Sequence, residues 1–95
     1  MIKVIVVRHF LPEKERDAAR LLGELRRREV QQDGCIKGDI LWSIDDPSMW
    51  VDISTWTHSD QWKKWESTEE YNEVQHKMLN LLVTTEEVIT LKIYK

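Results

Sequence analysis

Three tryptophans stand within ten positions of one another, in the segment DISTWTHSDQWKKW that runs from Asp52 to Trp65. They are Trp56, Trp62 and Trp65, in a chain that has a single phenylalanine. An indole ring is hard to bury completely, because its N–H needs a hydrogen-bond partner. The three rings therefore either fill a small core or wall a cavity that holds a flat ligand.

Trp56 and Trp65 are the two rings that we predict beside a ligand. Trp56 shares one face of a predicted strand with Asp52 and Ser54, a mixed lining that is more typical of a cavity wall than of a dry core. Trp62 and Trp65 are three residues apart on a predicted helix, so at least one of them points at the sheet. The alternative is that these rings are core anchors and contact no ligand.

Two further side chains have types suited to acid–base or electrostatic chemistry. His76 lies in a predicted helix and is our candidate proton acceptor, because histidine titrates near neutral pH; a hydrogen-bonded surface histidine is the alternative. Arg8 ends an otherwise apolar strand, where a guanidinium needs water or an anionic partner. That partner is either a protein carboxylate, such as Asp52, or an enolate or carboxylate group of a ligand.

Other kinds of site have little support in the sequence. No two histidines or cysteines stand at a recognised metal-ligand spacing, and there is no glycine-rich loop to hold a phosphate. We therefore expect neither a metal nor a nucleotide cofactor. Cys35, the one cysteine, has no obvious base nearby and is typical of a small buried hydrophobe rather than a nucleophile.

The composition indicates one soluble globular domain over residues 1–95. Hydrophobic residues make up 41% of the chain and charged residues 33%, with a formal net charge of −3. This charge offers no attraction to nucleic acid or to an anionic membrane, so we expect neither as a partner. The N-terminal residues have no export-signal pattern and the lone cysteine can form no internal disulfide, so we expect a cytoplasmic protein.

The hydrophobic periodicity predicts four strands and three helices to position these side chains. A helix opened by Pro12 and acidic residues follows the first strand and stops at Asp33-Gly34. Thr57 with Asp60, and Ser67 with Glu70, have the spacing of capping boxes that begin two consecutive helices. The predicted strands cover 2–10, 35–44, 50–56 and 88–94, and the later helices cover about 59–65 and 68–82.

This β-α-β-β-α-β order is the ferredoxin-like plan, an α+β fold in which helices cover one face of a four-stranded antiparallel sheet. The first strand is apolar on both of its sides, and the last strand offers Ile89, Leu91 and Ile93. A sheet face this apolar would aggregate if it were left open. We therefore expect a homodimer, in which the open sheet faces of two copies pack together about a two-fold axis.

Three segments then resemble a known family. The strand end VRHF, the hairpin GDILWSIDDPSMWVDISTW and the segment SDQWKKWESTEEYNEVQH resemble the antibiotic biosynthesis monooxygenase family of dimeric α+β barrels, over essentially the whole chain. The resemblance implies a ligand held between the helices and the sheet. It also implies oxidation of an electron-rich aromatic or quinol by molecular oxygen, without a metal or flavin.

A haem-degrading branch of these proteins has a haem-binding histidine, a tryptophan and an asparagine, which this resemblance places at Gln75, Trp65 and Arg8. Of these three residue types, this chain has only the tryptophan at the corresponding position. His76 lies one residue beyond the histidine position. Neighbouring helical residues point about 100° apart. We therefore expect no haem, and Gln75 joins the candidate ligand-binding residues.

Together these observations predict a cofactor-independent monooxygenase that acts on a small aromatic, quinol or polyketide-like molecule in a pocket between helices and sheet. His76 is the candidate catalytic residue. The alternatives are a dimer that binds or senses a small molecule without turnover, and a haem-degrading monooxygenase. The candidate substrate-binding residues are Arg8, Trp56, Trp65 and Gln75.

Overall fold

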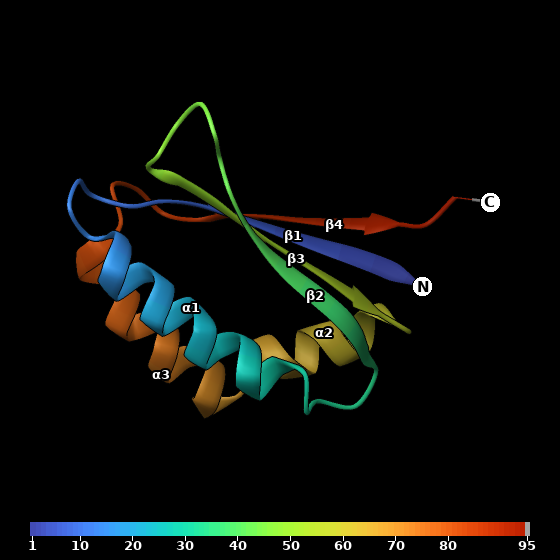
Figure 1. Ribbon diagram of the computed structural model, residues 1–95. Helices are drawn as coiled ribbons and strands as arrows, with labels where there is room; N and C mark the ends of the chain where they lie inside the picture. The colour runs from blue at the N-terminus through green and yellow to red at the C-terminus, as the bar shows by residue number, and fades with distance from the viewer. Residues whose placement is uncertain (95) are drawn as a thin grey trace.

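The computed structural model describes residues 1–94 and confirms the ferredoxin-like α+β plan, with four antiparallel strands and three α-helices (Figure 1). The elements in chain order are β1 (Ile2–His9), α1 (Glu15–Glu29), β2 (Cys35–Trp42), β3 (Met49–Trp56), α2 (Ser59–Glu66), α3 (Glu69–Met78), the single 3-10 turn η1 (Leu79–Leu81) and β4 (Glu87–Lys92).

β1 lies inside the sheet, as its apolar sequence predicts. The strand order is β2-β3-β1-β4, and every neighbouring pair is antiparallel. Val6 in the middle of β1 pairs with Asp52 of β3 on one side and with Val88 of β4 on the other. Residues at the end of β1 therefore lie between the start of β3 and the start of β4.

All three helices cover one face of the sheet (Figure 1). Side chains alternate between the two faces of a strand, and on β1 the buried ones are Val4, Val6 and Arg8. Asp52 and Ser54 are the buried polar residues of β3 on this same face. The helix-facing side of the sheet thus carries charged and polar groups as well as apolar ones.

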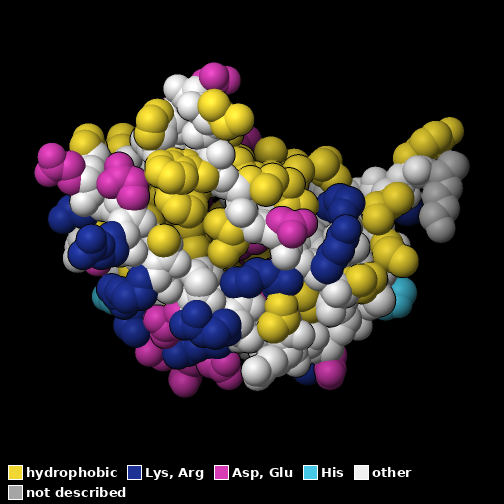
Figure 2. Space-filling view, in the orientation of Figure 1, with side chains coloured by type: hydrophobic (Ala, Val, Ile, Leu, Met, Phe, Trp, Pro, Cys, Tyr) yellow, Lys and Arg dark blue, Asp and Glu magenta, His cyan; other side chains and the backbone are white. Residues whose placement is uncertain are grey.

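The opposite face of the sheet is open and largely apolar. Its half-buried or exposed hydrophobic residues are Ile5, Val7, Leu41, Val51, Ile53, Ile89 and Leu91. In the space-filling view, hydrophobic side chains gather over the strands, whereas charged side chains dominate the surface of the helices (Figure 2). We call these half-buried and exposed hydrophobic residues of the strands the open sheet face.

The tryptophans of the DISTWTHSDQWKKW segment are buried in the core between the helices and the sheet. Trp56, Trp62 and Trp65 are at most 3% exposed. They form a chain of edge-to-face contacts through Tyr71, with ring centroids 5.9 Å apart for Trp56 and Trp62, 5.8 Å for Trp62 and Tyr71, and 5.5 Å for Trp65 and Tyr71. The Trp56 indole N–H donates to the Ser54 hydroxyl at 2.9 Å.

Element ends differ from the predicted ones by a few residues. Helix α1 begins at Glu15 rather than at Pro12, because Glu13 has φ 66°, which no α-helix accommodates. Helix α3 ends at Met78 and continues only as the short turn η1. None of the helices within residues 1–94 is both long and apolar enough to cross a membrane.

Both predicted capping boxes are wrong by one residue. His58, not Thr57, precedes α2, and its backbone N–H donates to the Gln61 side chain at 3.0 Å. Thr68, not Ser67, caps α3, and its hydroxyl accepts the backbone N–H of Tyr71 at 3.1 Å. In each case the polar residue one step later makes the capping contact.

Candidate functional site

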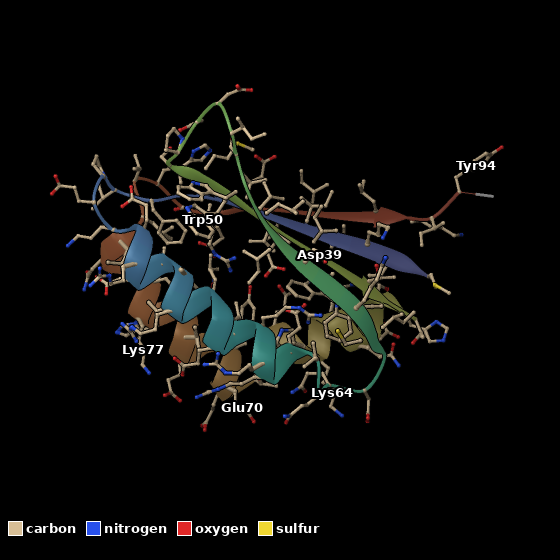
Figure 3. All side chains as sticks on the ribbon, viewed as in Figure 1. Asp39, Trp50, Lys64, Glu70, Lys77 and Tyr94 are labelled. Atoms are coloured by element: carbon tan, nitrogen blue, oxygen red, sulfur yellow. The ribbon has the colours of Figure 1, made fainter. Side chains whose placement is uncertain are left out.

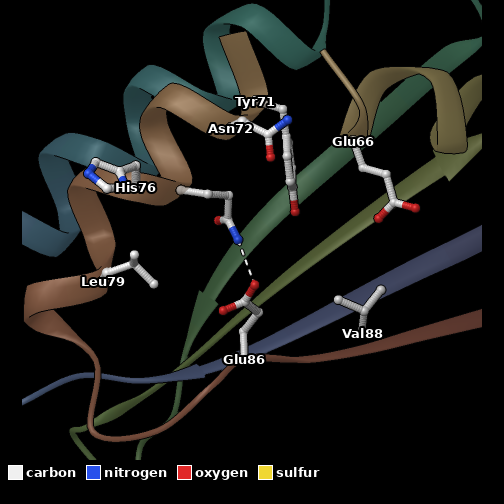
Figure 4. Close-up of a pocket in the computed structure, with 8 residues that line it drawn as sticks. Glu66, Tyr71, Asn72, His76, Leu79, Glu86 and Val88 are labelled. Carbon is white, nitrogen blue, oxygen red and sulfur yellow. Dashed lines mark hydrogen bonds between the residues drawn. The ribbon is translucent and has the colours of Figure 1, made fainter. Parts of the chain in front are cut away.

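A cleft of about 450 Å³ opens between helix α3 and the start of β4 (Figure 4). We call it the α3–β4 cleft. Its size is in the range of pockets that hold small molecules. Its wall combines carboxylates, amides, a phenol and apolar groups. The lining residues are Glu66, Tyr71, Asn72, Gln75, His76, Leu79, Glu86 and Val88.

A chain of polar contacts runs from the buried sheet to this cleft. Arg8 is 1% exposed, and its Nη2 donates to Gln75 Oε1 at 2.6 Å. Gln75 Nε2 in turn donates to Glu86 Oε1 at 2.7 Å, the contact drawn as a dashed line in Figure 4. On its other side, Arg8 Nη1 lies 4.0 Å from Asp52 Oδ2. The guanidinium therefore has protein partners on both sides.

Behind Arg8, two carboxylates are buried close to one another. Glu29 is 1% exposed, and burial together with the nearby charge of Asp52 raises its pKa from 4.5 to about 7. Burial also raises the pKa of Asp52, against the opposing effect of the Arg8 guanidinium. Within the described residues, one oxygen of each carboxylate has no hydrogen-bond partner. A proton is therefore readily held by this pair near neutral pH.

Tyr71 places a neutral hydroxyl in the cleft. The residue is only 6% exposed, and burial raises the pKa of its phenol to about 12. Figure 4 shows its hydroxyl pointing into the space between Glu66 and Glu86. No hydrogen bond to this hydroxyl forms among residues 1–94. Tyr71 is thus a free donor and acceptor at neutral pH.

Two of the five predicted site residues line this cleft, and a third contacts one of them. Gln75 faces inward and His76 is exposed at the mouth, whereas Arg8 contacts Gln75 from behind. Trp56 is fully buried in the core. Trp65 borders a separate hollow of about 230 Å³, whose other lining residues are Gln32, Asp33, Gln61 and Lys64. The structure therefore does not bring the two tryptophans to the cleft that Gln75 and His76 line.

Sequence reasoning did not identify Glu66, Tyr71 or Glu86 as site residues. Glu86 could have been found from strand register, because β1 and β4 pair with Val7 opposite Glu87. Glu86 directly precedes Glu87, so this register brings it to the end of β1 where Arg8 lies. An acidic residue beside a buried arginine is a strong signal, but it requires the register.

The residues at the cleft do not fit a haem group. Gln75 occupies the position that the resemblance assigns to the iron-binding histidine, and its amide is bound to Arg8 and Glu86. His76 is exposed at the mouth instead of facing inward. Two carboxylates line the wall, where haem propionates would need cations. Within residues 1–94, no group of three or more His, Cys, Asp or Glu is arranged to hold a metal ion.

The sequence matches a family whose fold has this architecture. The sequence model of the family described as "Antibiotic biosynthesis monooxygenase" matches residues 1–77, which is most of the chain. This chain belongs to the antibiotic biosynthesis monooxygenase family. The match includes Arg8, Gln75 and His76 and ends before Glu86. No curated protein sequence matches the chain.

Solved structures of antibiotic biosynthesis monooxygenases share the fold over the whole chain. One such crystal structure has a TM-score of 0.91 at 21% identity and covers 100% of both chains. A Nitrosomonas europaea protein, described as a candidate member, has a TM-score of 0.92 at 16% identity and 100% coverage of both chains. A candidate from Deinococcus radiodurans has a TM-score of 0.92 at 12% identity and covers 100% of this chain and 94% of its own. At these identities the similarity shows the fold alone.

Proposed function

We propose that this protein binds a small, flat aromatic, quinol or polyketide-like molecule in the α3–β4 cleft and oxidises it with molecular oxygen, without a metal, flavin or haem. The observation that carries the proposal is the cleft itself. Leu79 and Val88 give it an apolar wall, and the polar groups of Tyr71, Gln75 and Glu86 converge on the same space. Membership of the monooxygenase family supports the choice of reaction.

The proposed chemistry needs only a proton acceptor and a shaped cavity. In an anthrone-type aromatic substrate, an activated ring methylene group gives a proton to the protein base, and the carbanion passes one electron to molecular oxygen. The resulting radical and superoxide join in a C–O bond, and the hydroperoxide loses water. Overall, one methylene group and one molecule of oxygen give one carbonyl group and one molecule of water. One oxygen atom therefore enters the product, and the other leaves as water with the two methylene hydrogens.

We take two groups at the cleft as the candidate proton acceptors. His76 is the residue predicted from the sequence, and it lies exposed at the mouth. Glu86 is the residue that the structure adds, and Gln75 fixes one of its oxygens at 2.7 Å. An acceptor must reach the acidic carbon of the bound substrate, so substitution of each group identifies which one acts.

Binding without turnover is the second candidate function, and one observation favours it. An oxygenase gains from a cation that stabilises the substrate anion. Arg8 is the buried cation nearest the cleft, but Asp52 and Gln75 already engage it. A protein that only binds or senses the same ligand would need no such cation.

We also propose that the protein is a homodimer joined through the open sheet face. Val51 lies in the middle of this face, paired with Val7 on one side and with Leu41 on the other. Leu41 is 50% exposed and Leu91 is 47% exposed. A contiguous apolar surface of this kind is stabilised when a second copy covers it.

Oxygen uptake tests the proposed function. The purified protein is mixed with anthrone, which has the activated ring methylene group that the proposed step needs, in an oxygen-electrode cell, and binding is measured separately by calorimetry. If His76 is the base, His76→Ala lowers turnover by about a hundredfold or more with little change in affinity; if Glu86 is the base, Glu86→Gln does so.

Glu70→Gln is the matched control, because Glu70 lies on the outer side of the helix layer (Figure 3). Saturable binding without oxygen uptake supports the binding function, and no binding contradicts both.

A further inference from the structure

We propose that the α3–β4 cleft selects uncharged or cationic aromatic ligands that bring hydrogen-bond donors, such as hydroxy- or amino-aromatics, and rejects anionic ones. The inference rests on the proposed ligand site and names the chemical class that the site accepts. It follows from the charges at the wall, from the fixed orientation of one amide and from one hydroxyl that opens into the cleft without a partner among residues 1–94.

The wall of the cleft carries two carboxylates, Glu66 and Glu86. Figure 4 shows both at the same open space, which Val88 borders. Among the described lining residues, His76 is the one side chain able to carry positive charge, and it stands at the exposed mouth. The interior of the cleft is therefore acidic, and a ligand carboxylate or phosphate would enter against like charge.

Arg8 does not reverse this charge. Its Nη2 is bound to Gln75 Oε1 and its Nη1 faces Asp52, so Gln75 stands between the guanidinium and the cleft. Because the Gln75 oxygen accepts from Arg8, its amide NH2 must point the other way, where it donates to Glu86. Arg8 thus orients Gln75, and Gln75 fixes Glu86 as an acceptor at the wall.

Tyr71 points to a ligand at this cleft independently of the charges and of Gln75. Its side chain is more than nine-tenths buried, yet its hydroxyl points into the cleft without a hydrogen-bond partner among residues 1–94. The hydroxyl oxygen is not one of the fully buried unpaired atoms of residues 1–94, so it is open to the cleft, where a ligand hydroxyl or amine can replace solvent as its hydrogen-bond partner. The phenol stays neutral, so it adds no negative charge of its own.

The ligand class follows from these groups taken together. Leu79 and Val88 offer apolar surface for a ring. The carboxylates of Glu66 and Glu86 accept hydrogen bonds but cannot donate them when ionised. A ring that carries O–H, N–H or an ammonium group matches this wall, whereas a ring that carries a carboxylate matches neither its charge nor its hydrogen-bonding capacity.

Three naphthalenes of nearly equal size test the selection: 1-naphthylmethylammonium, 1-naphthylmethanol and 1-naphthoate. Their dissociation constants are measured by calorimetry at neutral pH and low salt. We expect the ammonium to bind most tightly, the alcohol next and the carboxylate least tightly. Each cleft carboxylate should contribute roughly a fivefold preference for the ammonium over the carboxylate, the scale of a partly exposed ion pair.

Glu86→Gln and Glu66→Gln keep the size of the side chain and remove its charge, so both should lower that ratio. Glu70→Gln changes the net charge equally but lies outside the cleft, and it should leave the ratio unchanged. Circular dichroism verifies that each variant is folded. The charge selection would be overturned if 1-naphthoate bound as tightly as the ammonium or more tightly. It would also be overturned if Glu86→Gln and Glu66→Gln left the preference for the ammonium over the carboxylate unchanged. Neither result would contradict the proposed ligand site itself. Failure of all three probes to bind would overturn the proposed ligand site together with the charge selection.

Discussion

Arg8 and Gln75 are 67 positions apart in the chain, yet a 2.6 Å hydrogen bond joins Arg8 Nη2 to Gln75 Oε1. The bond connects the central strand β1 to helix α3 across the interior. It places the Arg8 guanidinium between Asp52 and Gln75, and it turns the amide NH2 of Gln75 toward Glu86 at the cleft. One buried cation thus compensates a core carboxylate and also orients a residue of the candidate site.

Replacement of Arg8 by methionine should destabilise the protein by about 3 kcal/mol, because Asp52 would keep a buried carboxylate without its cation. Urea unfolding measures the change in the free energy of unfolding. The control is Arg20→Met, since Arg20 is exposed and lies 3.9 Å from Asp17; this change should cost less than about 1 kcal/mol. An Arg8→Met variant as stable as the Arg20→Met control would show that the buried contact contributes little.

Glu29 should make the protein less stable as the pH rises toward neutrality. Its pKa is raised from 4.5 to about 7 by folding, so the folded state binds more protons than the unfolded state in that window. The resulting stabilisation is complete below pH of about 4.5 and is lost as the pH rises through about 7. Its size is about 1 to 3 kcal/mol. The raised pKa of Asp52 acts in the same direction.

Urea unfolding at a series of pH values measures this dependence. Glu29→Gln should flatten it and should leave the protein more stable than wild type at pH above about 7, because the buried amide needs no proton. Glu70→Gln serves as the control and should retain the wild-type slope. A wild-type stability that rises with pH between about 5 and 7 would contradict the proposed role of Glu29.

Hydrophobic pattern was enough to predict the fold, because burial leaves a direct record in the sequence. Val4 and Val6 alternate with Ile5 and Val7 in β1, and this two-sided apolar strand is indeed central. Ala18, Leu21, Leu22 and Leu25 stand at i, i+3, i+4 and i+7, the spacing of one helix face, and all four are buried in α1. The hydrophobic pattern was less able to predict the residues at which α2 and α3 begin. Two polar residues stand side by side at each start, and spacing alone does not decide which of them makes the cap.

The candidate site was only partly predictable, because it depends on contacts between distant segments. A protein carboxylate beside Arg8 was one of two open alternatives, and Asp52 is the carboxylate that the structure places there. Gln75 was reached through family resemblance alone. Glu86 lies near Gln75 because it directly precedes β4, whose first residue, Glu87, pairs with Val7 of β1, and no local pattern around residue 86 records that register.

Trp65 should contribute to stability and not to ligand affinity at the α3–β4 cleft. It is 1% exposed, packs edge-to-face on Tyr71 at 5.5 Å and does not line the cleft. Trp65→Phe removes buried ring area and should cost about 2 kcal/mol of unfolding free energy. Calorimetric titration with 1-naphthylmethanol should give an affinity within about twofold of wild type. The sequence-based hypothesis of a ligand-stacking Trp65 predicts the reverse, a large loss of affinity.

Val51 should control the oligomeric state if two copies pack through the open sheet face. Val51→Glu buries a carboxylate at the centre of that interface, where it would have no partner, and should raise the dimer dissociation constant by about a hundredfold or more. Val30→Glu is the matched control, because Val30 is 46% exposed at the end of α1, on the helix side of the molecule. Sedimentation equilibrium measures both variants. A wild-type protein that is monomeric at micromolar concentration, or a Val51→Glu variant that dimerises as tightly as Val30→Glu, would exclude this face as the interface.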